Sequence, residues 1–134
     1  MSASWALQQA VFAALSANDE VADAFGARIF DRPPRGAAFP YCVIGDDAQS
    51  DWSTATEKGS EHALQVHVWS RADGHKEAKL AAQAVQDALD GAELDVTGQA
   101  LIAIRHLATD FTRETDGETT RAVLRFRAVM EPAV

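Results

Sequence analysis

The sequence has a single cysteine, no long apolar run and no basic leader segment. Cys42 stands alone, which excludes a disulfide within the chain and fits a cytoplasmic product. No apolar stretch approaches the roughly 18 residues that a membrane span needs, so no membrane partner is expected. The N-terminal segment has no positively charged start, and Gln8 and Gln9 interrupt its apolar residues. We therefore expect it to form a helix of the mature protein and not a secretion signal.

Basic residues are also scarce. Twelve Lys and Arg residues stand against 20 Asp and Glu residues, which gives a formal net charge of −8. Tight wrapping of nucleic acid needs many cationic side chains that release counterions from the phosphates. The charge therefore argues against a high-affinity DNA-binding protein, but it is compatible with a surface along which DNA slides without sticking.

Recognisable catalytic and metal-binding motifs are missing as well. The sequence holds no P-loop, no GxGxxG, no GxSxG and no CxxC pattern. His62 and His67 lie five residues apart on a predicted strand, so they face opposite sides of it. The adjacent Asp46 and Asp47 should diverge in the same way, which favours a solvated acidic rim over a cation site. We expect no enzyme, no cofactor and no metal; the alternative is a small enzyme or ligand-binding module that uses Asp46, Asp47 and His67.

What the sequence does contain is clear periodicity. Apolar residues at helical spacing predict a first helix that includes Leu7 and Leu15, a short second helix between Asn18 and Gly26, and a third from about residue 73 to Gly91. Strands are predicted at 29–30, 41–45 and 61–70, followed by a hairpin of 100–112 and 119–130. The order predicts one α+β domain over residues 1–134, with an antiparallel-dominated sheet and helices packed on one side.

Three local features carry their own predictions. Residues 46–60 are polar, so we expect either a loop or a long flexible hairpin arm that carries Trp52. Trp5 and Phe12 stand seven residues apart, which predicts a second helix stripe packed on a neighbouring element. The face parity of residues 100–112 changes along the strand, and a bulge near 105–106 would reconcile it.

One face of the predicted sheet has an unusual composition. The outward positions of the strands carry Gln65, His67, Trp69, Arg121, Arg125 and Arg127. Tryptophan and arginine are enriched where proteins bind each other, so this face is a candidate interface. In the alternative interpretation, Trp69 is covered by a loop and the arginines pair with surface carboxylates of their own chain.

Three stretches together resemble a known family. They are "RIFDRPP…AAFPYCVIGDD", "ALQVHVWSR…GHKEAKLAAQAVQDAL" and "FTRETDGETTRAVLRFRAVM", the last with the Asp116–Gly117 turn. Over nearly the whole chain, to Met130, they resemble the phage tail-completion family that includes the tail terminator proteins of siphophage-type tails and gene transfer agents. None of the three is a catalytic signature, so the resemblance rests on pattern over length.

The resemblance implies a structural protein of the particle, assembled in the bacterial cytoplasm. It implies a hexameric ring of this chain at the head-proximal end of the tail tube, which ends tube polymerisation and joins the tail to the neck. The partners would be further copies, the tail tube protein and a neck or stopper protein, with DNA passing through without specific binding. Two acidic loops and the arginine face would supply the contacts: Asp46, Asp47, Asp51, Trp52, Trp69, Arg113, Asp116, Glu118, Arg121, Arg125 and Arg127.

Other assignments remain open at this point. Within the same class, the chain could be another neck or tail-completion component, such as a stopper or connector. A competing class is a DNA-binding module on the arginine face, which would show tight binding to DNA at low salt.

Overall fold

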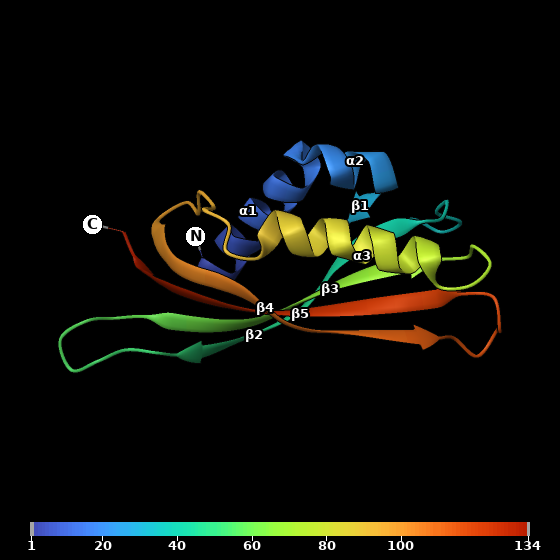
Figure 1. Cartoon of the computed structure of the whole chain (residues 1–134). Helices are drawn as coiled ribbons and strands as arrows, with labels where there is room; N and C mark the ends of the chain where they lie inside the picture. Colours follow the sequence, from blue (N-terminus) through green and yellow to red (C-terminus); the bar gives the residue numbers. More distant parts are fainter. Residues whose placement is uncertain (1, 134) are drawn as a thin grey trace.

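The computed structural model describes residues 2–133 and has an α+β fold, as the sequence predicts (Figure 1). Three helices lie over one face of a five-stranded sheet, and the other face carries no helix. The elements are α1 (Ala3–Ala17), α2 (Asp19–Phe25), β1 (Ile29–Phe30), β2 (Tyr41–Asp51), β3 (Ser60–Ser70), α3 (Lys76–Leu89), β4 (Gln99–Arg113) and β5 (Thr120–Pro132). None of these helices is long and apolar enough to cross a membrane.

The sheet has the order β1-β2-β3-β5-β4. All neighbouring strands run antiparallel except β1 and β2, which pair in parallel over two residues only. The β2–β3 hairpin and the β4–β5 hairpin extend to opposite ends of the sheet, because Ser60 of β3 faces Met130 while Ser70 faces Thr120. The two ends of the molecule therefore present two different hairpins (Figure 1).

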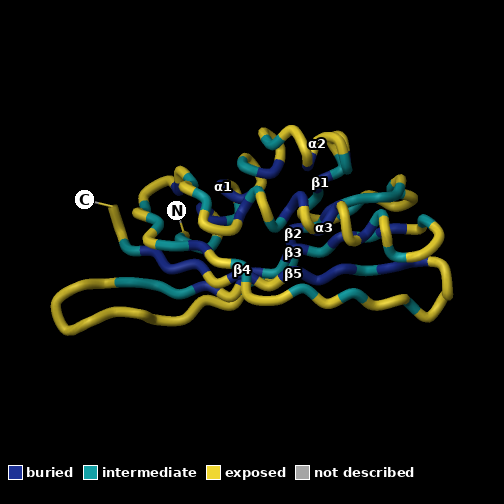
Figure 2. The backbone as a smooth tube through the Cα atoms, in the orientation of Figure 1, coloured by how far each residue is buried: buried dark blue, intermediate teal, exposed yellow. Residues whose placement is uncertain are grey.

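Strand alternation produces the core. Leu64, Val66 and Val68 of β3 are buried, and so are the residues of β5 that share their face, from Ala122 to Met130. Above them lies α3, whose inner stripe is rich in alanine, and small side chains allow a helix to approach a sheet closely. Figure 2 shows the resulting buried layer between the sheet and the helices.

The helix boundaries follow from local chemistry. The side chain of Ser2 accepts a hydrogen bond from the backbone N–H of Trp5 at the start of α1, and Asn18 does the same for Val21 at the start of α2. Gly26 ends α2 with φ near 60°, a conformation that favours glycine. The predicted Asn18 cap and Gly26 stop are both confirmed.

The polar segment 46–60 is a hairpin arm, so of the two alternatives the loop is wrong. Strand β2 continues to Asp51, and only residues 52–59 connect it to β3. A bulge where Gly45 and Asp46 oppose Gln65 shifts the register at the base of the arm. Cross-strand hydrogen bonds can continue through polar residues, because the ladder is made by the backbone and needs no apolar side chain.

Two further predictions meet different outcomes. Trp5 and Phe12 do not form a buried second stripe; both side chains are about half exposed and border an open hollow beside Asp31 and Ile44, so the predicted packing on a neighbouring element is wrong in its burial. The predicted bulge in β4 is confirmed one residue later, at Leu107, and a second bulge occurs at Ile102. Both bulged residues are large and exposed.

Candidate assembly surfaces

The helix-free face of the sheet carries the predicted tryptophan. Trp69 stacks on Tyr41 of the neighbouring strand, with ring centroids 6.3 Å apart, and the Arg121 guanidinium lies 5.4 Å from the Trp69 ring centroid on its other neighbour. Burial raises the pKa of Tyr41, in keeping with its place in this stack. These three side chains form one row across β2, β3 and β5 and present a flat aromatic surface with a cation at its side.

The arginines of this face are paired within their own chain. Arg127 contacts Glu61 at 2.6 Å, and Arg125 contacts Asp110. Arg121 Nε lies 3.1 Å from Glu114 Oε1, an ion pair whose atoms are not aligned for a hydrogen bond. This is the pairing that the alternative interpretation of the face expects, and the two more exposed pairs, of Arg125 and Arg127, contribute only about 0–1 kcal/mol each.

The acidic turn between β4 and β5 is well defined. Asp116 accepts hydrogen bonds of 2.8 Å from the backbone N–H groups of Thr119 and Glu118, and its other oxygen accepts one from the Thr119 hydroxyl. These donors, Thr119 first, lower the pKa of Asp116 to about 2. Arg113 donates to the backbone oxygen of Gly117 in the same turn. The turn therefore presents a fixed negative charge at one end of the sheet.

The predicted interface residues fall into three separate places. Asp46, Asp47, Asp51 and Trp52 belong to the β2–β3 arm, while Arg113, Asp116 and Glu118 belong to the β4–β5 turn at the opposite end. Trp69 and the three β5 arginines lie between these ends on the helix-free face. Trp52 is half exposed at the start of the arm tip, where its backbone N–H donates to Gly59.

Asp47 does not form a common site with Asp46 and His67. It turns to the helix side of the sheet, where Ser4 of α1 donates a hydrogen bond to its carboxylate. His67 lies on the helix-free face beside Asp46, and its ring nitrogen is 3.1 Å from Gln65 Oε1. Burial first, and then the Arg121 charge, lower the pKa of His67 below its usual value. The three-residue enzyme site therefore has no geometric basis.

A polar network that no sequence motif indicated joins Asp47 to the core. His62 Nδ1 lies 3.4 Å from Asp47 Oδ2, and His62 Nε2 lies 3.0 Å from the Ser60 hydroxyl. The order Ser–His–Asp has the connectivity of a hydrolase triad. However, the His62 side chain is 0% exposed, so it has no access to a substrate. We interpret these hydrogen bonds as a link that holds α1 against the base of the arm. The signal in the sequence was a histidine at an inward strand position with a serine two residues before it.

The part of the chain that the structure describes contains no group of three His, Cys, Asp or Glu side chains that could hold a metal ion. Cys42 is buried, and burial raises the pKa of its thiol to about 12. The thiol is therefore held in its protonated, unreactive form at neutral pH.

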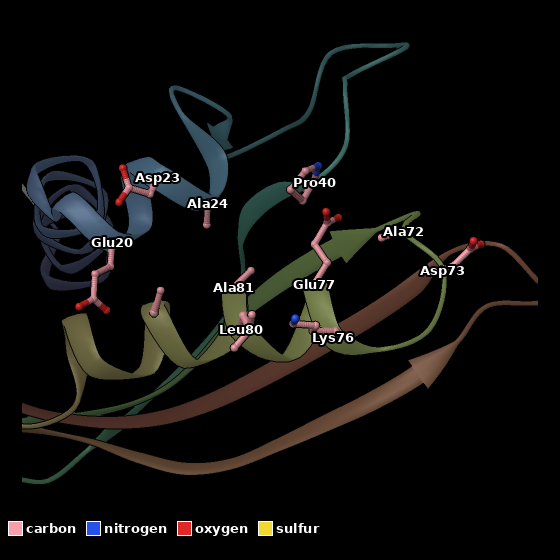
Figure 3. Close-up of a pocket in the computed structure, with 11 residues that line it drawn as sticks. Glu20, Asp23, Ala24, Pro40, Ala72, Asp73, Lys76, Glu77, Leu80 and Ala81 are labelled. Atoms are coloured by element: carbon pink, nitrogen blue, oxygen red, sulfur yellow. The ribbon is translucent and has the colours of Figure 1, made fainter.

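Among the hollows of the described residues, two are lined by residues of α1, α2 or α3. The larger, of about 690 Å³, runs between α2 and α3; Glu20 and Asp23 of α2 and Lys76 of α3 line it, with the exposed Leu80 (Figure 3). The smaller, of about 360 Å³, lies where α1 meets the β1–β2 edge of the sheet. Trp5 and Phe12, whose spacing predicted a second stripe packed on a neighbouring element, line this second hollow.

Comparison with known proteins gives a family match over almost the whole chain. The family model described as "Tail completion protein gp17" matches residues 9–131. A protein of that description from Bacillus phage SPP1 is 26% identical over 100 residues, which cover 75% of this chain and 74% of the relative.

Two solved structures also resemble this chain. A chain in the structure described as "Virion of native gene transfer agent (GTA) particle" has a TM-score of 0.91 and 33% identity, and covers 97% of this chain and 98% of its own. The structure of the bacteriophage SPP1 gp17 protein has a TM-score of 0.66 at 25% identity, covering 94% and 89% of the two chains.

Proposed function

Because this chain belongs to the tail completion protein gp17 family of structural virion proteins, we propose that it ends and caps the tail tube of a phage-like particle. Six copies form a ring at the head-proximal end of the tube. The ring stops further tube polymerisation and presents its other face to a neck or stopper protein, and DNA passes through its centre.

The observation that carries this proposal is the likeness to the chain from the gene transfer agent virion. The TM-score is 0.91 and the match covers more than nine-tenths of both chains, so the likeness extends over nearly the whole described fold. The same fold is shared with the SPP1 gp17 protein. This supports a mature location in the tail of the particle.

The electrostatics of the chain are compatible with a DNA channel. Each copy carries a formal charge of −8, and the cations on the helix-free face are already paired with carboxylates of the same chain. A lumen with little unpaired positive charge would not hold phosphate groups, so DNA could slide. The structure thus supports passage of DNA and gives less support to a DNA-binding module on the arginine face.

The three surfaces predicted from the sequence are proposed contacts with neighbours in the tail. The arm can reach beyond the helix layer, the turn carries the Asp116 charge, and the Trp69 row offers an aromatic surface. We expect Trp52→Ala and Arg125→Glu to leave the monomer folded, since both side chains are exposed, and to lower the yield of rings. Arg35→Glu makes the same charge change in the loop before β2 and serves as a control. Normal ring yield in both test variants would remove these surfaces from the interface.

Deletion of the gene in the producing bacterium tests the proposed role. Without the protein, tails should grow to uncontrolled length and fail to join heads, and the purified protein added to growing tubes should stop their elongation. Electron microscopy of the particles measures both effects. Tails of normal length that lack only the head joint would indicate a stopper or connector and contradict the terminator role.

A further inference from the structure

The two edges of the sheet are open in different ways. At one edge, β1 covers only Cys42 and Val43 of β2, so the outer side of β2 from Ile44 onward has no strand beside it among the described residues. At the other edge, the loop after α3 bonds to β4 at Gln99, Ile104 and His106, so among the described residues no strand pairs with the outer side of β4. A sheet with two unlike open edges can pair one edge with the other edge of a second copy.

The β2 edge carries an apolar hollow, which we call the α1 groove. Its volume is about 360 Å³, and it is lined by Trp5, Gln8, Gln9, Phe12, Asp31 and Ile44. Trp5 and Phe12 are seven residues apart on α1, so they lie on the same side of the helix, about two turns from each other. Two half-exposed aromatic rings at the border of a hollow are typical of a site that receives an apolar side chain.

The β4 edge carries matching groups. Each of its two bulges inserts one extra residue, and the extra residues are Ile102 and Leu107, both exposed aliphatic side chains. Arg105 stands between them and is also exposed. We call these three residues the β4 edge patch. Among residues 2–133, neither Arg105 nor the Asp31 of the α1 groove forms an ion pair.

We propose that the α1 groove of one copy receives the β4 edge patch of the next copy. Leu107 enters between Trp5 and Phe12, and Arg105 meets Asp31 at the rim. Apolar groups thereby cover apolar groups, and an unpaired cation gains an unpaired anion. Because groove and patch lie at opposite edges of the sheet, each copy that joins leaves one free groove and one free patch. Such a head-to-tail contact continues until a ring closes.

The closed ring rests on the proposed function, but the contact itself can be tested residue by residue. A Phe12→Cys/Leu107→Cys variant is assembled into particles in the producing bacterium and treated with a short bis-maleimide crosslinker. Cys42 is buried with a raised pKa and should not react. We expect a ladder of covalent multimers on a denaturing gel, because the two engineered thiols of neighbouring copies meet in the contact.

The chain offers a matched control. Leu80 is 62% exposed and Leu107 is 61% exposed, but Leu80 lies beside the other hollow, between α2 and α3. A Leu80→Cys/Leu107→Cys variant should therefore stay largely monomeric on the gel. A monomeric Phe12→Cys/Leu107→Cys chain, or an equally strong ladder in the control, would overturn the proposal.

Charge reversal gives an independent readout. Asp31→Arg and Arg105→Asp alone should each lower the yield of head-joined tails several-fold, and the double variant should recover most of the loss. Two single variants that assemble normally would exclude the ion pair. Rings imaged at the tail end without the 12–107 crosslink would refute this contact and leave the proposed function standing, whereas a chain absent from the tails would refute both.

Discussion

Truncation of Phe126 tests whether β5 and β4 enclose the core as described. The Phe126 side chain is 1% exposed, and the His106 ring of β4 approaches it edge-on with centroids 5.5 Å apart. Phe126→Ala removes a buried ring, and because a packed core relaxes only in part, it leaves a cavity. We expect a loss of about 3–5 kcal/mol in the free energy of unfolding.

The loss can be measured by urea unfolding of the purified chain. The denaturant slope should stay unchanged, because the surface exposed on unfolding is nearly the same in both proteins. For a domain of this size, the same loss should lower the midpoint of thermal unfolding by roughly 10–20 °C.

Phe12→Ala is the matched control, since it removes the same atoms from a side chain that is 46% exposed on α1. We expect it to cost less than about 1 kcal/mol, because little buried surface is lost. Equal losses from the two variants would refute the reasoning, since they would mean that the half-exposed Phe12 is packed as tightly as the centre of the sheet.

Three further perturbations follow from single contacts. Asp116→Asn should loosen the β4–β5 turn, because a neutral amide accepts the hydrogen bonds of Thr119 more weakly than the carboxylate does. In the unchanged chain, the stabilisation by charged Asp116 should be intact above pH 4 and lost as the pH falls through about 2, and carboxyl NMR should follow this titration. Gly45→Ala should destabilise the chain by about 1–3 kcal/mol in urea unfolding, since the new methyl group would lie 2.7 Å from the His67 ring. The pKa of His67 is lowered by burial and by Arg121, so the unfolded chain binds a proton at His67 more readily than the folded chain does. The free energy of unfolding should therefore decrease as the pH falls below about 6.5. A His67→Gln variant should show a weaker decrease.

The sequence predicted those parts of the fold whose signals are local. Helix caps such as Asn18 act over three or four residues, and the Asp116–Gly117 turn sets the register of the last hairpin by itself. Alternation along β3 was readable because one face is buried and the other is not. The helices' place on a single face followed from the order of the elements.

The sequence could not predict features that depend on residues far away in the chain. The polar residues after Gly45 continue as a strand because β3 lies beside them, and no periodicity within 46–51 reveals this. The place of Asp47 depends on Ser4, which is 43 residues away in the chain. Trp5 and Phe12 have the spacing of a buried stripe, and only the absence of a covering element in the described fold leaves them exposed.

The hairpin arm also allows the chain to vary in length without loss of the fold. Among the described residues, the backbone hydrogen bonds of its tip stay within the tip, from Trp52 to Gly59 and from Thr54 to Glu57, and no residue of 46–60 belongs to the hydrophobic core. Insertion of one residue in each strand would keep the pairing in register and lengthen the arm by roughly 3.4 Å. Evolution or an engineer could thus adjust how far the protein reaches, or attach a label there, while every residue that holds the body together stays in place.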